Sequence, residues 1–250
     1  MPEPLRTFRA ELHVHTVLSP CAEVEMIPPL IVQQALENQI DIIAITDHNA
    51  TANIRAVQKA AQGSGLVVLP GMELQTVEEV HSLCLFEETS QAEIFQKIVS
   101  QALPPLKNDP DHFGEQFVVD ETGDFIRRED QLLILSTEMS LSQAWRFVNE
   151  MGGIFIPAHV NRKAFGLLEN LGFIPQDIPL PAVEISRHLK ADEAVQKFPQ
   201  LFGYTLLKGG DAHRLDELAG FNEFTLAEPT FAEIKLAINS FEGRSLKIIE

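Results

Sequence analysis

Short apolar runs that end in polar, ligand-type residues alternate with stretches of helical periodicity along most of this chain. That alternation is typical of parallel strands joined by crossover helices, and it predicts an α/β fold. Strands are expected near 9–14, 41–46, 65–72, 79–86, 153–158, 182–186 and 204–209. Helices are expected near 27–38, 50–62, 89–103, 140–151, 163–171, 190–199 and 230–241. With 250 residues, 45% of them hydrophobic, a single barrel domain over 1–250 is the expectation.

Residues 104–137 interrupt this rhythm. They are dense in turn formers, among them Pro104-Pro105 and Glu121-Thr122-Gly123-Asp124, around the short apolar run 116–119. Such a composition predicts an inserted excursion from the barrel. We expect the excursion to serve as a lid or as an oligomer contact, and the sequence does not decide between them or give the oligomeric state.

Histidines recur where the expected strands end. Six of the eight lie in motifs of this kind: His13-Val14-His15, Thr46-Asp47-His48, Val80-His81, Ala158-His159 and Asp211-Ala212-His213. Two residues apart on a strand, His13 and His15 project to the same face. Because the carboxyl ends of barrel strands meet around one mouth, these imidazoles are expected to converge with Glu73 on divalent metal ions. This inventory indicates catalysis rather than a structural role.

These motifs carry a resemblance to a known family. In family order, the chain resembles the PHP (polymerase and histidinol phosphatase) superfamily at His13-x-His15-Thr16, Ile45-Thr46-Asp47-His48, Gly71-Met72-Glu73, His81, Ala158-His159 and Asp211-Ala212-His213. The resemblance extends over nearly the whole length. It implies a distorted (β/α)7 TIM-like barrel with a trinuclear metal cluster at its C-terminal mouth.

The resemblance also implies a ligand set for two to three divalent ions. The first ion would be held by His13, His15, Glu73 and Asp211. Glu73 would bridge to a second ion held by His81 and His159. His48, His213 and one residue of the loop after His15 would hold the third. Zinc, manganese and iron all suit such ligands, so the native metal stays open.

That loop departs from the common family pattern, in which an aspartate or histidine follows closely. Here it reads Ser19-Pro20-Cys21-Ala22-Glu23-Val24-Glu25, and three residues compete for one role. Glu25, just ahead of a helix start marked by prolines, is the first choice, followed by Glu23. Cys21 as a thiolate would favour zinc or iron, but we interpret it as a small buried cysteine. Asp47 is expected to orient a metal-bound imidazole rather than to ligate.

The ligand set predicts a metal-dependent phosphoesterase in which a metal-activated water hydrolyses a small phosphomonoester or a nucleotide phosphate. Glu73, Asp211 and His213 are its expected catalytic residues. Relatives suggest histidinol phosphate, nucleoside 3′,5′-bisphosphates or short oligonucleotides as substrates. Cations at strand-end loops are expected to bind the substrate: Arg162, Arg187 and His188. The alternative is a metal-binding interaction or regulatory module of the same fold without activity, and a barrel amidohydrolase acting on a non-phosphate bond ranks lower.

Charge and composition set the expected partners and location. A formal net charge of −17 disfavours long nucleic acid as a partner, because its binding relies on Lys and Arg releasing counterions, so a small phosphorylated substrate is expected. Residues 1–6 lack the apolar core of a signal peptide, and no apolar run approaches the roughly 20 residues of a membrane span. Two cysteines make no disulfide framework, which favours the cytoplasm.

Overall fold

The computed structural model describes residues 4–249, so part of the 1–6 segment considered above lies outside the described residues. The strands are β1 (Arg6–Val14), β2 (Ile42–Ile45), β3 (Val67–Gln75), β4 (His81–Leu85), β5 (Phe117–Val119), β6 (Phe125–Arg128), β7 (Ile154–Pro157), β8 (Ala182–Ser186), β9 (Thr205–Gly209), β10 (Asn222–Leu226) and β11 (Ser245–Ile248). The α-helices are α1 (Pro28–Glu37), α2 (Ile54–Ala60), α3 (Thr89–Ala102), α4 (Pro110–Phe113), α5 (Leu141–Glu150), α6 (Leu167–Leu171), α7 (Ala191–Lys197) and α8 (Phe231–Ile238).

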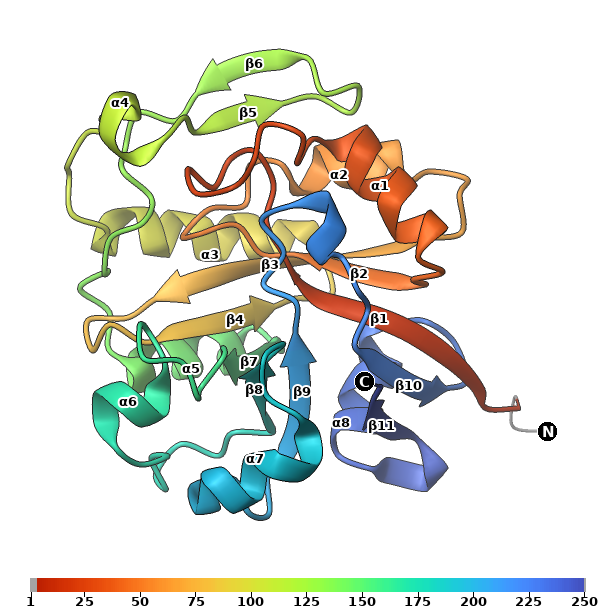
Figure 1. Ribbon diagram of the computed structural model, residues 1–250. Coiled ribbons are helices and arrows are strands. Elements are labelled where there is room, and N and C mark those ends of the chain that lie inside the picture. The colour runs from red at the N-terminus through yellow and green to blue at the C-terminus, as the bar shows by residue number, and fades with distance from the viewer. Residues whose placement is uncertain (1–3, 250) are drawn as a thin grey trace.

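The main sheet has seven strands in the order β11-β10-β1-β2-β3-β4-β7, and β8 pairs with β9 beside it (Figure 1). Strands β1, β2 and β3 are parallel, as expected, but β4 runs antiparallel to both β3 and β7. The expectation of uniformly parallel strands is therefore wrong, and a regular (β/α)7 count is not reproduced. Only residues 76–80 separate β3 from β4, which is too short for a crossover helix and enforces a hairpin.

Two strands near the C-terminus were missed from the sequence. β10 pairs antiparallel with β1 and β11 with β10, so they extend the sheet on the far side of β1. Residues of β10 are alternately buried and half-buried, the pattern of a strand with one covered face. Helix α8, which was expected, packs over this part of the sheet.

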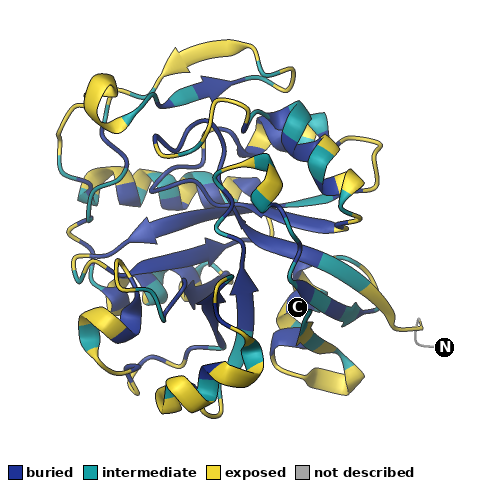
Figure 2. Ribbon diagram, viewed as in Figure 1, coloured by how far each residue is buried: buried dark blue, intermediate teal, exposed yellow. Residues whose placement is uncertain are grey.

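The core has two layers separated by the sheet. Along β2, Ile42 and Ala44 face one apolar cluster that fills the inside of the curved sheet, while Ile43 and Ile45 face another that contacts the covering helices. A strand that is buried on both faces has a continuous run of apolar residues, and this run allowed β2 to be predicted from the sequence. Figure 2 shows the central strands buried, and β6 and the outer faces of the helices exposed.

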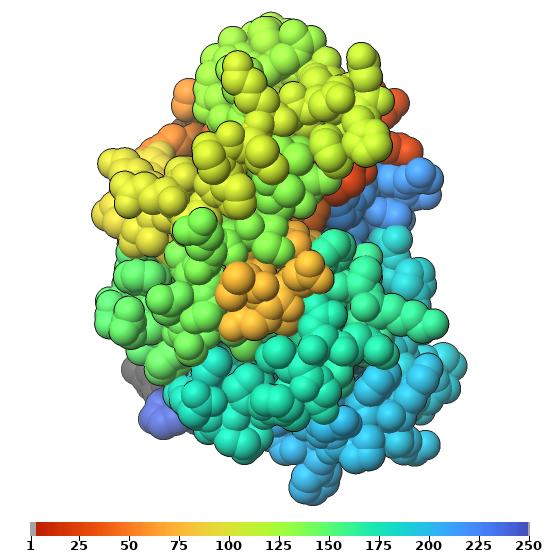
Figure 3. Space-filling view, turned by 90° about the vertical axis from the view of Figure 1, so that its left-hand side faces the viewer, coloured from red at the N-terminus to blue at the C-terminus, as the bar shows by residue number. Residues whose placement is uncertain are grey.

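The excursion at 104–137 holds α4 and the β5–β6 hairpin, at the top of Figure 1 and in yellow-green at the top of Figure 3. Hydrogen bonds connect this excursion to the loop after β1. The Phe117 N–H donates to the Val17 carbonyl at 3.1 Å, and the Asn53 side-chain amide donates to both Thr16 Oγ1 and the Phe117 carbonyl. Within 4–249, the helices are all too short or too polar to cross a membrane.

Candidate metal centre

The expected ligands converge at one end of the curved sheet. His13 and His15 stand at the end of β1, His48 follows β2, Glu73 lies in β3 and His159 follows β7. His81 is the first residue of β4, and it reaches the same end because β4 is reversed. Asp211 and His213 follow β9. Eight residues from distant parts of the sequence thus meet because neighbouring strands end together.

Glu73 is the centre of this cluster. Its side chain is fully buried, and its oxygens lie 2.8–3.4 Å from ring nitrogens of five histidines: His13, His15, His48, His81 and His159. Asp211 Oδ1 adds a second carboxylate, 3.3 Å from Nε2 of both His13 and His15. A carboxylate with two oxygens placed between two groups of imidazoles suits a bridging ligand.

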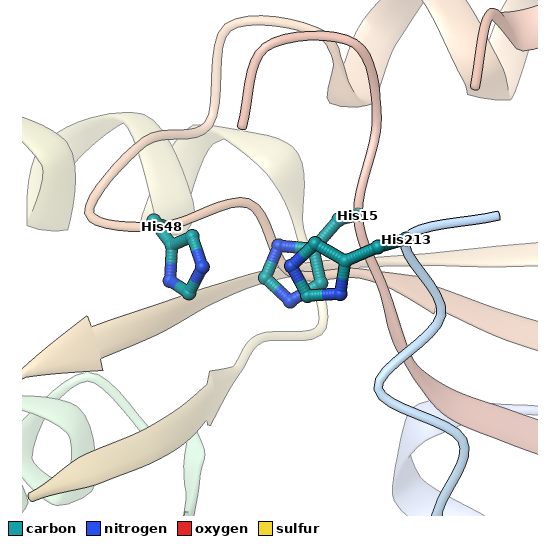
Figure 4. Close-up of side chains that lie close together, drawn as sticks. All are labelled: His15, His48 and His213. Atoms are coloured by element: carbon teal, nitrogen blue, oxygen red, sulfur yellow. The ribbon is translucent and has the colours of Figure 1, made fainter. Parts of the chain in front are cut away.

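Three subsets of these side chains bring their donor atoms close enough to share an ion. They are His13 with His15, Glu73 and Asp211; His48 with Glu73 and His81; and His15 with His48 and His213. Figure 4 shows the last group: the His15 and His213 rings are stacked, with 4.0 Å between their centroids, and His48 lies to their left. The first group has the four residues that the resemblance implied for the first ion, whereas the second group has His48 where His159 was expected.

Three of these histidines form a hydrogen bond through Nδ1, the ring nitrogen that points away from the centre of the cluster. Nδ1 of His13 lies 3.0 Å from the Glu184 carboxylate, Nδ1 of His213 lies 2.9 Å from the Asp211 carbonyl, and Nδ1 of His15 lies 2.9 Å from Ser19 Oγ. A carboxylate and a carbonyl only accept, and the Ser19 hydroxyl gives its proton to Asp47, so each Nδ1 must be the donor. The Nε2 lone pairs are then free for a metal, the arrangement usual for metal-bound histidine.

Buried polar atoms without partners test whether a metal fits. Four atoms of the cluster are buried and make no hydrogen bond within the described residues: Nε2 of His13, Nε2 of His15, Oε2 of Glu73 and Oδ1 of Asp211. They lie close together, since His15 Nε2 is 3.4 Å from Glu73 Oε2 and 3.3 Å from Asp211 Oδ1. Buried polar atoms are costly when unpaired. A divalent cation would satisfy all four, so the residues present fit the metal that the fold implies.

The electrostatics of Glu73 and His81 agree with ligand roles, whereas burial lowers the pKa of His13 and His48 but their anionic neighbours outweigh it and raise both pKa values well above the ordinary value. Burial opposes ionisation of Glu73, but the surrounding His81, His13 and His48 hold its pKa well below the ordinary value, so it stays anionic. Burial lowers the pKa of His81 to about 4, which keeps that ring neutral. An anionic carboxylate and a neutral imidazole are the forms in which these groups bind metals.

Two of the ligands have a strained backbone. His159 has φ of +30° and Asp211 has φ of +47°, in the left-handed region that side chains other than glycine rarely adopt. Each residue lies two positions after the last residue of a strand, Pro157 of β7 or Gly209 of β9. Strain of this kind persists where the surrounding structure holds a functional side chain in place.

The loop after His15 differs from expectation. Glu25 is exposed and belongs to none of the groups that could hold an ion, and Glu23, also exposed, pairs with Arg214 at 3.1 Å. Glu25 as the loop ligand is therefore not supported, since its side chain faces solvent. Cys21 is exposed, so its interpretation as a small buried cysteine is wrong. Burial of the sulfur raises the pKa of this thiol, but the neighbouring His48 and His213 outweigh burial and bring the pKa to about 6.

Asp47 lies behind the cluster. One oxygen accepts from the Thr16 N–H at 2.7 Å and from Ser19 Oγ at 2.8 Å, and the other accepts from Thr16 Oγ1. Ser19 in turn accepts from His15. Asp47 thus orients an imidazole through one hydroxyl, which is the role expected for it.

An open cleft of about 510 Å³ lies over the cluster, lined by His48, His81, His159, Asp211 and His213 together with the three residues expected to bind substrate. Arg162 is ion-paired with Asp211 and is 40% exposed. Arg187 donates to the Gly210 carbonyl and to Glu217, each at 2.7 Å, so its guanidinium is largely engaged by the protein. His188 is exposed at the rim.

Sequence reasoning missed two residues of the site. Glu184 accepts from His13 and, through the same oxygen, from the His159 N–H at 3.0 Å. A lone acidic residue inside the apolar strand Ala182–Ser186 was the available signal. Phe165, with φ of +60°, stacks on the His81 ring at 4.4 Å and 6° and lines the cleft. Nothing in the sequence distinguished this phenylalanine from those of the core.

A curved α/β sheet carrying a buried histidine and carboxylate cluster beneath an open cleft defines the class of metal-dependent barrel hydrolases. The PHP-domain model matches residues 11–157, more than half of the chain, and the chain belongs to this family of metal-dependent hydrolases. The family resemblance is therefore confirmed. Asp211 and His213 lie beyond the matched segment, yet the fold brings them to the same centre.

Solved structures share the fold at low identity. The endonuclease Q structure from Pyrococcus furiosus superposes with a TM-score of 0.77 and 18% identity, covering 96% of this chain and 58% of that one. Endonuclease Q in complex with a 27-mer duplex bearing an abasic lesion gives a TM-score of 0.71 at 17% identity, with the same coverage. A 75-residue segment is 37% identical to the 5′-3′ exoribonuclease Rnm of Salmonella typhimurium.

That segment is 29% of this chain and 25% of the exoribonuclease, so the chain matches only part of these relatives' length. The comparisons nevertheless overturn one expectation. Long nucleic acid was excluded as a partner because of the net charge of −17, yet this fold occurs in an endonuclease solved on duplex DNA. Net charge averages the whole surface, whereas binding depends on the cations, including metal ions, that line the site.

Proposed function

We propose that this protein is a metal-dependent phosphoesterase that hydrolyses phosphate esters of nucleic acid strands. The observation that carries the proposal is the cleft itself, which places an arginine and an exposed aromatic ring over the metal centre. Nuclease relatives by sequence and by fold favour a nucleic acid over a small phosphomonoester.

The ligands of the centre would be His13, His15, His48, Glu73, His81, His159, Asp211 and His213. Divalent ions held there supply a nucleophile from water near neutral pH and a positive charge for the phosphate oxygens. Glu73 serves this chemistry by remaining anionic between the two groups of imidazoles. No side chain of the protein needs to act as nucleophile.

Phosphate binding is assigned to Arg162. Its guanidinium is partly exposed and already meets one oxygen of Asp211, so it lies at the junction of cluster and cleft. A guanidinium presents several N–H donors in one plane and can bind Asp211 and a phosphate oxygen together. Arg187, held by Glu217, is better placed to support the wall of the cleft and the Asp211 loop through Gly210.

Phe165 offers a stacking surface for a base next to the scissile phosphate. Its ring covers His81 on one side, and the residue is 36% exposed on the other. The His81 N–H donates to the Phe165 carbonyl at 3.0 Å, so ring and metal ligand are held together. Base stacking on aromatic rings is tolerant of sequence, which suits a nuclease without strict base recognition.

The cleft has room for a limited part of a strand. Its volume of about 510 Å³ falls among sites that enclose a small ligand, roughly 300–1,000 Å³. A phosphate with one flanking nucleoside fits such a volume better than a continuous duplex. We therefore expect a strand end, or a nucleotide displaced from a duplex, to be the reacting part.

The test is hydrolysis by metal-replete protein of end-labelled single-stranded RNA, single-stranded DNA and duplex DNA with an abasic site, compared with simple phosphomonoesters. Zinc, manganese and iron are loaded separately, and Glu73→Gln is the control variant. Release of nucleotides or shortened strands by the native protein alone supports the proposal. Full metal loading without cleavage of any nucleic acid would contradict it and favour the metal-binding interaction module.

A further inference from the structure

The segment after β9 carries two of the expected ligands, Asp211 and His213, but it is weakly joined to the main sheet. Within residues 4–249, β9 forms a ladder with β8 alone, and one isolated bridge connects Ala212 to Val14 of β1. Asp211 also has a left-handed backbone, with φ of +47°. Such a conformation persists only where surrounding contacts enforce it, so other groups must hold this segment.

Glu217 supplies these contacts with both of its carboxylate oxygens. Oε2 accepts from the backbone N–H of His213 at 2.8 Å, and Oε1 accepts from the Arg187 guanidinium at 2.7 Å. A second nitrogen of that guanidinium donates to the Gly210 carbonyl, also at 2.7 Å. The three hydrogen bonds close a ring around the segment 210–213, from the carbonyl at its start to the N–H at its end.

We propose that Glu217 is a positioning residue of the metal centre and holds Asp211 and His213 in place through the segment 210–213. These two side chains belong to different groups of residues that could share an ion, so one carboxylate fixes ligands of two groups. Glu217 is not itself in any of those groups, and each of its oxygens accepts a hydrogen bond. The inference rests on the metal centre of the proposed function but not on its substrate.

Gly210 shows how closely this segment is enclosed. An added Cβ there would lie 2.8 Å from Oε2 of Glu11 and 2.9 Å from the backbone carbonyl oxygen of Glu217. Glu11 is fully buried in β1, and its Oε1 accepts from the Gly210 N–H at 3.0 Å. The segment is therefore held by Glu11 from the barrel interior, and by Arg187 and Glu217 from the cleft.

The proposal gives Arg187 a different role from the substrate binding that was expected of it. Arg187 lines the cleft, but two of its nitrogens donate to the protein and its side chain is only 28% exposed. If Arg187 bound a phosphate, removal of the Glu217 carboxylate would release it and strengthen substrate binding. If Arg187 acts with Glu217 on the ligand segment, the same removal weakens metal binding.

The experiment is a double-mutant cycle on the full chain, with zinc affinity measured by competition with a chelating dye. Arg187→Met and Glu217→Leu should each weaken binding of the weakest-held ion by about tenfold or more, as is usual when a partner of a metal ligand is lost. The double variant should bind no more weakly than the poorer single variant, because the two residues act as one unit. Asp216→Asn, an exposed neighbour in the turn Leu215–Glu217, should bind zinc as the native protein does.

Two further variants separate positioning from general damage to the fold. Gly210→Ala keeps both side chains of the pair but crowds Glu11 and the Glu217 backbone, so it should also weaken zinc binding. Glu217→Gln keeps one acceptor oxygen and should lose less affinity than Glu217→Leu. Urea unfolding of each metal-free variant establishes that it has folded.

Amide hydrogen exchange of the metal-free protein gives a readout that does not depend on any ion. The His213 N–H should exchange at least about tenfold faster in Glu217→Leu than in the native protein, and at the native rate in Asp216→Asn. Losses of zinc affinity that add in the double variant, or a native exchange rate at His213 in Glu217→Leu, would overturn the assignment. Either result leaves the proposed hydrolase intact, whereas a native protein that binds no metal would contradict both.

Discussion

A single oxygen of Glu184 holds two metal ligands, because Oε1 accepts from Nδ1 of His13 and from the backbone N–H of His159, each at 3.0 Å. His13 is the penultimate residue of β1 and His159 follows β7, so this carboxylate connects residues from strands that are not neighbours in the sheet. Gly209 passes so close that an added Cβ would lie 2.2 Å from the Glu184 carboxylate carbon. The glycine is required for the carboxylate to occupy this position.

Glu184→Leu should weaken metal binding by about 10–100-fold, because it removes the acceptor that directs Nε2 of His13 inward. Glu184→Gln keeps an acceptor oxygen and should recover most of the affinity. Competitive titration against a chelating dye measures both variants. Equal affinity in native protein and Glu184→Leu would show that His13 needs no such partner, and Glu223→Gln on β10 serves as a control away from the cluster.

Glu73→Gln should lose at least about one ion per chain and nearly all hydrolytic activity. The substitution keeps the shape of the side chain but removes the charge that lies among five imidazoles. Elemental analysis of the purified variant measures the ion content, and circular dichroism establishes that it has folded. A variant with full metal content and native turnover would exclude Glu73 as a bridging ligand.

Phe165→Ala should raise KM for an oligonucleotide while leaving hydrolysis of a phosphomonoester without a base nearly unchanged. The expected loss is about 1–3 kcal/mol for one stacked base. Phe173→Ala is the matched control, since Phe173 is 58% exposed but does not line the cleft. Equal losses on both substrates would instead indicate that Phe165 supports His81.

Chelation should lower the thermal stability of the native protein, because ions that bind only the folded chain stabilise it by mass action. At a free ion concentration 100 times Kd the effect is about 2.7 kcal/mol. Thermal unfolding with and without a chelator, followed by readdition of zinc, measures it. The same treatment should leave the melting temperature of Glu73→Gln much less changed.

Arg244→Met should destabilise the C-terminal part of the fold near neutral pH but not in acid. Arg244 binds both oxygens of Glu233 at 2.8 and 2.9 Å, and this lowers the pKa of Glu233 below its ordinary value of 4.5. A carboxylate with a lowered pKa stabilises the folded state above that ordinary value, and the contribution disappears as pH falls through the folded pKa.

Urea unfolding of native protein and variant at pH 7 and at pH 3 tests this, with a difference expected only at pH 7. Arg146→Met is the control, because Arg146 lies on the exposed face of α5 with its acidic partner 4.0 Å away. A difference that is the same at both pH values would show that Arg244 acts through packing alone.

The sequence predicted that these side chains would converge, because the end of a strand can be recognised from local sequence. His13 and His15, two residues apart, had to share a face, and the structure places them 5.2 Å apart between ring centroids. The direction of a strand within the sheet, by contrast, cannot be recognised from the local sequence. The reversal of β4 depends on the short 76–80 turn, and it was overlooked because a buried strand has the same composition in either direction.

The loop ligand and the supporting carboxylate were harder to predict for a different reason. Cys21, Glu23 and Glu25 lie in a loop whose position depends on a distant segment, since the Glu23 N–H donates to the His213 carbonyl. Glu184 is distant in sequence from both groups that it holds. Such contacts between distant segments have no periodicity for a pattern to reveal.

The ligands extend from His13 to His213, and this spread has a consequence for biosynthesis. A chain emerging from the ribosome exposes His13, His15, His48 and Glu73 long before Asp211 and His213 have been made. Any ion that binds early meets an incomplete coordination sphere and can leave again. The cluster is therefore complete only after the segment following β9 has been made and reaches the end of the first strand, where the Ala212 N–H donates to the His13 carbonyl.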